Sequence, residues 1–143
     1  MQKKHMFKTG LAGFAAAMAL VAAPIASAAT PTVTVRVVGK TKTLLATKTV
    51  HTKSGSITRG GVAAGKCPAT SAQGALNVAT HGHWKGSWYA NYHEYFITGI
   101  LGDNETSKKY YWGLYLNGKL ASKGACLIKL KSGDKLLFKV TKS

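Results

Sequence analysis

Acidic residues are scarce in this sequence. Four of its 143 residues are Asp or Glu, against 20 Lys and Arg. Glu94, Asp103, Glu105 and Asp134 are scattered, so no pair of carboxylates is evident for general acid–base catalysis. A G-x-S-x-G nucleophile elbow is also missing. The sequence therefore predicts a protein with no catalytic residues and no cofactor, and it leaves open a Ser-His-Asp arrangement assembled from distant positions.

Cysteine is equally sparse, with Cys67 and Cys126 alone. An even cysteine count in an exported protein indicates a disulfide, and two unpaired buried thiols are the alternative. A bond between these residues would close a loop of 59 residues. The chain-entropy model then gives a stabilisation on the order of 4 kcal/mol.

Long apolar runs are confined to the beginning of the chain. Lys3, Lys4 and Lys8 precede an alanine-rich apolar run over residues 11–25, and Ala26-Ser27-Ala28 has the small-x-small pattern of a cleavage site. We therefore expect residues 1–28 to be a cleaved signal peptide and residues 29–143 to form one domain. No transmembrane segment is expected after cleavage, which favours a protein that is secreted or loosely associated with the cell envelope.

Arginine is limited to Arg36 and Arg59, although the chain is strongly basic. Three of the 20 Lys and Arg belong to the predicted leader, which leaves 17 against four acids and a net charge of +13. Spread lysines can serve solubility and protect sheet edges. They can also attract a polyanion such as an anionic cell-envelope polymer or a lipid surface. Readers of nucleic acid usually use more arginine, so nucleic acid is not expected as a partner.

The first part of the mature chain alternates between apolar and polar residues. Residues 32–38 place Val33, Val35 and Val37 on one face, which predicts a half-buried strand, and residues 43–52 form its antiparallel partner after a turn at Gly39. Residues 54–66 are rich in glycine and predict a loop. A capping-box spacing from Thr70 to Gln73 predicts one short helix over residues 71–79.

Residues 95–140 organise the predicted sheet. Asn117-Gly118 lies between apolar residues, which is the strongest short-range signal of a β-hairpin. A second tight turn at residues 132–134 precedes a strand in which Leu136, Phe138 and Val140 share one face. On the strand before the hairpin, Trp112 falls on one face and Tyr115 on the other.

Aromatic residues gather in residues 81–93 and around Trp112. Exposed rings give a large contact area at a small entropic cost, although a small domain also needs rings for its core. The candidate ligand-binding residues are Trp84, Trp88, Tyr89, Trp112 and Tyr115.

Two further motifs give weaker evidence of a binding site. Residues 60–66 read G-G-V-A-A-G-K, but Cys67 replaces the hydroxyl residue that a phosphate-binding loop needs, so we expect a flexible loop. His81 and His83 could ligate zinc or copper, yet the further ligands are lacking, so no metal site is expected.

The second half of the chain resembles the C-terminal domain of transcobalamin and intrinsic factor, and the bacterial domain-of-unknown-function family named after it. The stretches that carry the resemblance are E-Y-F-I-T-G-I-L-G, Y-Y-W-G-L-Y-L-N-G-K and K-S-G-D-K-L-L-F-K-V. The matching positions are Ile100, Tyr111, Trp112, Asn117, Gly118, Gly133 and Asp134.

This resemblance implies an α+β fold of the ubiquitin-like β-grasp type, with a mixed sheet crossed by one short helix. It also implies a small non-catalytic binding module. In the cobalamin carriers this domain closes over one face of the corrinoid, so a corrinoid-like or other small-molecule ligand is expected, with a surface glycan or protein as further possibilities. The alternative function is a basic adhesion protein that binds anionic wall polymers or lipids by electrostatics.

Overall fold

The computed structural model describes residues 30–58, 65–105 and 107–143. The predicted signal peptide and most of the glycine-rich segment 60–66 lie outside these residues. The elements, in chain order, are β1 (Thr32–Val38), β2 (Thr43–His51), β3 (Ser56–Ile57), β4 (Cys67–Pro68), α1 (Ala72–Ala79), β5 (Trp84–Tyr89), η1 (Ala90–Tyr92), β6 (Glu94–Ile100), β7 (Tyr110–Leu116), β8 (Lys119–Leu120), η2 (Ala125–Leu127) and β9 (Lys135–Lys142).

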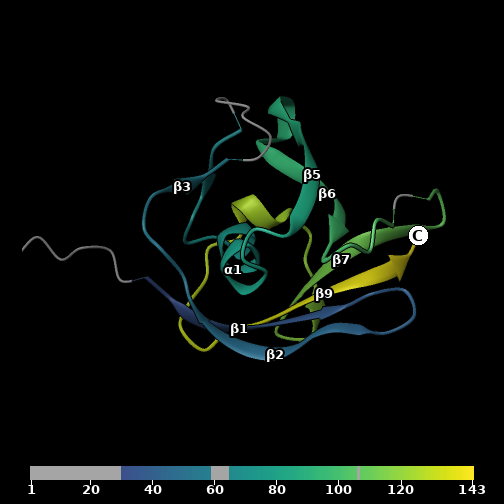
Figure 1. The fold of residues 1–143 in the computed structure, drawn as a ribbon. Helices are drawn as coiled ribbons and strands as arrows, with labels where there is room; N and C mark the ends of the chain where they lie inside the picture. Colours follow the sequence, from purple (N-terminus) through teal and green to yellow (C-terminus); the bar gives the residue numbers. More distant parts are fainter. Residues whose placement is uncertain (1–29, 59–64, 106) are drawn as a thin grey trace, which may run out of the picture.

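Five of the strands form one mixed sheet in the order β2-β1-β9-β7-β8 (Figure 1). β1 and β9 lie side by side and run parallel, whereas β1–β2, β7–β9 and β7–β8 are antiparallel. The parallel pair joins the first and last strands of the described chain, which places the carboxyl-terminal strand in the middle of the sheet. The predicted mixed sheet with one helix is confirmed, and the fold class is α+β.

The helix begins one residue later than the capping-box spacing suggested. Ser71, and not Thr70, is the N-cap, and its hydroxyl oxygen accepts a hydrogen bond from the Gly74 N–H at 3.3 Å. The same hydroxyl donates to the Pro68 carbonyl at 2.6 Å. Gln73 is fully buried and does not cap the helix by reaching back to its amino-terminal end. The helix is short, so packing on the sheet stabilises it more than intrinsic propensity does.

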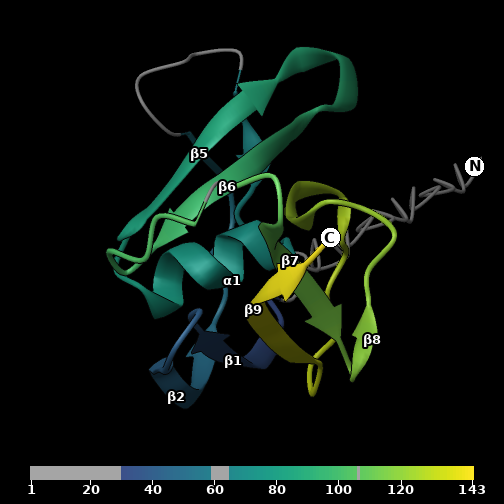
Figure 2. The same cartoon turned by 90° about the vertical axis from the view of Figure 1, so that its right-hand side faces the viewer.

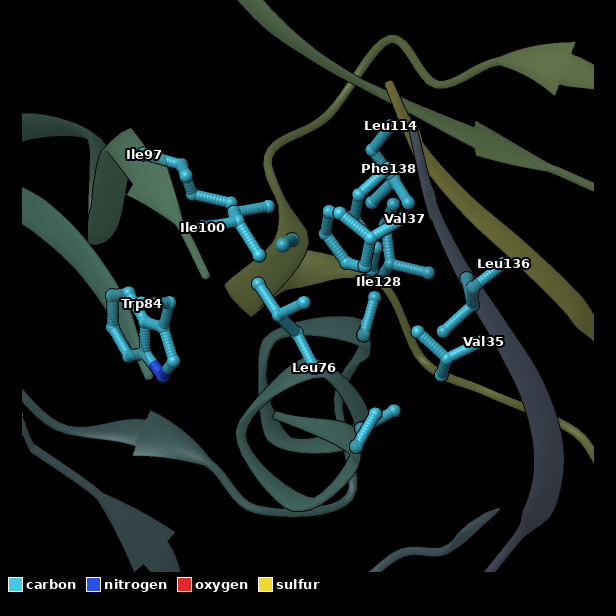
Figure 3. Close-up of a cluster of buried hydrophobic side chains, with 14 of the residues drawn as sticks. Val35, Val37, Leu76, Trp84, Ile97, Ile100, Leu114, Ile128, Leu136 and Phe138 are labelled. Carbon is cyan, nitrogen blue, oxygen red and sulfur yellow. The ribbon is translucent and has the colours of Figure 1, made fainter. Parts of the chain in front are cut away.

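The core lies between the inner face of the sheet and α1. Figure 3 shows Leu76 projecting from the helix toward Ile100 and Phe138. The predicted inward residues of β1 and β9 are all buried, with Val35, Val37 and Phe138 at 0% exposure. Their alternation with exposed neighbours such as Arg36 and Lys139 confirms the predicted apolar faces of both strands.

A long antiparallel hairpin forms a third layer. β5 pairs with β6, and both views of the fold place this hairpin on the side of α1 opposite the sheet (Figures 1 and 2). The aromatic segment was expected to contribute contact residues, but its strand β5 was not predicted because Gly82, Gly86 and Ser87 interrupt the apolar pattern. Trp84 anchors the hairpin, since its ring is buried and its Nε1–H donates to Asn77 Oδ1 of α1 at 2.9 Å.

The predicted tight turn and the predicted disulfide are both confirmed. Asn117 and Gly118 both have positive φ, 51° and 84°, as a type I′ turn requires, and Leu116 pairs with Lys119 across it. Cys67 and Cys126 form a disulfide with their Cα atoms 5.2 Å apart. The bond ties β4, just before the helix, to η2. Within the described ranges, no helix is long and apolar enough to cross a membrane.

Candidate functional site

A pocket of about 400 Å³ opens where the hairpin meets the edge of the main sheet. Three chain segments form its walls, namely the end of the hairpin with the start of β6, the strand β7, and β8 with the loop that leads to η2. Each segment lines the pocket with consecutive residues. They are Glu94, Tyr95, Phe96 and Ile97 on β6, Tyr111, Trp112, Gly113 and Leu114 on β7, and residues 120–125. A volume of this size suits a small molecule.

Exposed rings stand on the hairpin side of this pocket. Tyr89, Tyr92 and Phe96 line it and keep 50%, 70% and 50% of their surface exposed. The rings of Tyr89 and Phe96 contact each other edge to face, with centroids 6.3 Å apart. Leu120, which is 51% exposed, adds an apolar group from β8. Because these large apolar groups gather around one hollow, they mark a contact surface better than single exposed residues would.

The deeper wall of the pocket belongs to the core. Trp112 is 7% exposed, and Tyr95 and Leu114 are buried beside it. The Nε1–H of Trp112 is shielded from solvent and has no hydrogen-bond acceptor. The pocket therefore has a buried aromatic floor and a more exposed aromatic rim.

One carboxylate, that of Glu94, faces this aromatic lining. Its side chain is half-buried, and the Gly124 N–H donates a hydrogen bond to it. Its Oε1 is shielded from solvent and accepts no hydrogen bond. Burial raises the pKa of Glu94 above its ordinary value of 4.5, and the Gly124 hydrogen bond offsets part of that rise. Burial thus disfavours the charged form of this carboxylate, and the protein compensates for that only in part.

Gly124 is the residue that allows this placement. A Cβ at position 124 would lie 1.8 Å from Glu94 Oε2, so any side chain there would displace the carboxylate. The φ of Gly124 is −70°, which other residues adopt as well, so lack of bulk and not backbone freedom is what the position needs.

Replacing Glu94 with Gln should make the protein slightly more stable at pH 7. The raised pKa means that ionised Glu94 costs stability. This cost is absent below the unfolded-state pKa and develops as the pH rises from that value through the folded-state pKa. Solvent screens the open side of the group, so we expect a gain of about 0.5 kcal/mol or less. Urea unfolding of both proteins between pH 3.5 and 7.5 measures it, and a wild type that is the more stable of the two at pH 7 would contradict the account.

The structure separates the five sequence-predicted ligand residues. Tyr89 and Trp112 line the pocket. Trp84 is 2% exposed and belongs to the core, and Trp88 packs its ring on Tyr95 with centroids 4.9 Å apart. Tyr115 lies on the outer face of β7, where its hydroxyl is 3.1 Å from Thr141 Oγ1. The segment that was expected to bind therefore divides into one part that anchors the hairpin and another that faces the pocket.

Sequence reasoning missed Glu94, Phe96 and the loop 120–125. Phe96 could have been found, because it alternates with the buried residues Tyr95 and Ile97 and so must point away from the core. The loop carries no comparable signal, because its contribution is the absence of a side chain at Gly124.

His83, one of the two histidines considered as metal ligands, has its Nδ1 2.8 Å from the Thr80 carbonyl. His51, elsewhere in the fold, has its Nδ1 2.8 Å from Thr32 Oγ1. Among the residues that the model describes, no three His, Cys, Asp or Glu side chains come close enough together to hold a metal ion.

A comparison with models of known protein families finds a match for the second half of the chain. Residues 72–142, about half of the sequence, match a family model described as "Domain of unknown function (DUF4430)", which is the transcobalamin-like C-terminal family. The chain belongs to the DUF4430 family. The resemblance drawn from the three sequence stretches is confirmed. The matched region of this DUF4430 module runs from α1 to β9 and so contains every residue that lines the pocket.

Two solved structures of other proteins have a similar fold. Haptocorrin in complex with Cbi matches with a TM-score of 0.55 and 18% identity over 78% of this chain. The DUF4430 chain spans only 25% of the haptocorrin chain. A protein from Ruminococcus gnavus ATCC 29149, described as "a putative metal binding protein", matches with a TM-score of 0.50 and 16% identity, covering 79% of this chain and 98% of that one. No curated protein sequence matches.

Proposed function

We propose that this chain is a small, non-catalytic binding module that holds a small molecule in the pocket between β6, β7 and the loop 120–125. The observation that carries the proposal is the pocket itself, where three half-exposed or exposed rings surround a hollow with a buried aromatic floor. In a soluble protein, apolar side chains gathered in this way are usually covered by a partner.

The strand arrangement supports a β-grasp fold as part of this proposal. The order β2-β1-β9-β7 has the parallel pair in the middle and one helix across one face, which fits the fold that the resemblance implied. We further propose that residues 1–28 are a leader that directs export, which fits a disulfide between two buried cysteines.

A corrinoid is the first ligand to test, because the haptocorrin structure is a complex with Cbi. The pocket of about 400 Å³ is open on one side, so it would cover part of a ligand of that size and leave the rest exposed. A smaller aromatic or aliphatic molecule would fit the pocket completely.

Replacing Phe96 with Ala should weaken ligand binding about tenfold, since an aromatic contact residue at the rim contributes on the order of 1–2 kcal/mol. The half-exposed ring can be removed without opening the core. Tryptophan fluorescence can follow the titration, because Trp112 lines the pocket. Cbi and benzyl alcohol, a neutral aromatic probe, serve as ligands.

Leu127→Ala is the matched control, since Leu127 is 48% exposed and lies on η2 outside this pocket. Its affinity for both probes should equal that of the wild type. If Phe96→Ala and Leu127→Ala bind every probe with the same affinity as the wild type, the pocket is not the binding site.

A second candidate function rests on the outer face of the main sheet. Among the described residues, no helix or strand covers this face (Figures 1 and 2). The register places Arg36, Leu137 and Tyr115 in one row across β1, β9 and β7, and Lys135 and Lys139 flank that row along β9. No acidic residue occurs in these three strands, so the face suits an anionic polymer.

The double substitution Arg36→Gln and Lys139→Gln should then weaken binding to a polyanionic glycan such as heparin and reduce the salt dependence of that binding. Column retention at two ionic strengths measures both effects. If the variant is retained as strongly as the wild type, the lysines serve solubility and the adhesion function fails.

A further inference from the structure

We propose that the pocket selects ligands that carry a positively charged nitrogen, with Glu94 as the charge partner. This inference rests on the proposed function and names the chemical class of the ligand. It starts from the fact that a single acid lines the pocket, in a chain that contains four acids in all.

The other three acids have partners within the fold. Glu105 forms an ion pair with Lys40 at 3.7 Å, and Asp103 accepts a hydrogen bond from the Lys40 backbone at 3.0 Å. Asp134 accepts hydrogen bonds from Asn117 Nδ2 and the Lys131 backbone. Within the described part of the chain, no cation lies within ion-pair distance of Glu94. Asp103 and Asp134 likewise have no cation at that distance, but Glu94 differs from them because it lines the pocket and has a buried oxygen that accepts no hydrogen bond.

The position of this carboxylate is also fixed. Its two oxygens lie against Gly124, with a backbone hydrogen bond from that residue. Oε1 is shielded from solvent and unpaired, so water does not compensate its charge in full. A carboxylate in this state stabilises a cation placed beside it more strongly than a solvated one does, because the intervening dielectric constant is lower.

The rings around Glu94 favour the same class of ligand. Tyr89, Tyr92, Phe96 and Tyr111 line the pocket with Trp112. An ammonium group near the face of such rings is attracted by their quadrupole, and aromatic lining with one acid is typical of sites for organic cations. A neutral ligand would gain the apolar contacts only, and an anion would be repelled by Glu94.

One cation of the protein itself competes with this effect. Lys123 lines the pocket from the loop side, and its side chain is exposed. Because an exposed ammonium is well solvated and screened by salt, it offsets the field of the half-buried Glu94 only in part. The high overall positive charge is likewise spread over the surface and screened beyond about 10 Å.

Three soluble probes of nearly equal size test the charge preference: benzylammonium, benzyl alcohol and benzoate. Amide chemical shifts of the labelled chain at pH 7 give the affinity of each. We expect benzylammonium to bind about fivefold or more tightly than benzyl alcohol, and benzoate to bind weakest. Glu94→Gln should reduce the preference for benzylammonium to less than about twofold. Glu105→Gln, which removes the charge of an acid that is paired with Lys40 outside the pocket, should leave the preference unchanged.

The outcomes separate this inference from the function on which it rests. If benzyl alcohol binds in the pocket as tightly as benzylammonium, the charge preference is wrong and the binding function stands. If benzylammonium keeps its full advantage in Glu94→Gln, Glu94 is not the charge partner. If none of the three probes shifts the resonances of the pocket at millimolar concentration, the pocket function itself is wrong. The order of affinities is measured on the wild type, so this part of the test does not depend on whether a variant folds.

Discussion

Replacing Cys67 and Cys126 with Ala is expected to lower the free energy of unfolding by about 4 kcal/mol. The bond closes a loop of 59 residues that contains α1, the whole β5–β6 hairpin and β7. Without it, the unfolded chain gains the entropy of that loop, and η2 loses its covalent link to the segment before the helix. For a domain of this size, whose total stability is typically about 5–15 kcal/mol, the loss is a large share.

Urea unfolding of the wild type with and without a thiol reductant provides the control for this substitution. The reduced wild type should unfold at nearly the same urea concentration as the double variant, because both lack the same constraint. A double variant that unfolds within about 1 kcal/mol of the oxidised wild type would show that the bond contributes little, and that packing around η2 holds the two segments together.

Phe138→Ala is expected to cost about 3–5 kcal/mol, because it removes a fully buried ring from the central strand of the sheet. Phe138 pairs with Val37 on one side and with Leu114 on the other, so its ring lies where the parallel and antiparallel halves of the sheet meet. The cavity would open on the inner face of the sheet, toward Leu76 of α1 (Figure 3).

The neighbouring residue supplies a matched control. Leu137 lies on the same strand with its side chain on the outer, uncovered face, and Leu137→Ala should cost about 1 kcal/mol or less. Chemical denaturation of both variants measures the difference. Equal costs for the two substitutions would contradict the assignment of the inner and outer faces of β9.

The main sheet could be predicted from local patterns because each strand carries its own signal. Val33, Val35 and Val37 alternate with polar residues, and Asn117-Gly118 can adopt the positive φ values that a two-residue turn needs. The disulfide was predicted from the even cysteine count together with the predicted export signal. The strands and the turn depend on neighbours in sequence, which is the information that a single sequence contains.

The pocket could not be predicted in the same way because its parts are distant in sequence. Glu94 meets Gly124, which lies 30 positions further along the chain, and nothing near either residue indicates the contact. The roles of the aromatic residues could not be predicted from local sequence either. Trp84 and Tyr89 lie on one strand, yet Trp84 anchors the hairpin on α1 and Tyr89 faces the pocket, a division set by how the hairpin packs.

Chemical-shift mapping tests the central claim, a small-molecule site between β6, β7 and the loop 120–125, most directly. Labelled protein would be titrated with a panel of small aromatic and aliphatic probes that includes Cbi and benzylammonium. The account predicts that the shifted amides cluster in residues 89–97, 111–114 and 120–125. Shifts that cluster on the outward residues of β1 and β9, or no shifts with any probe, would contradict it.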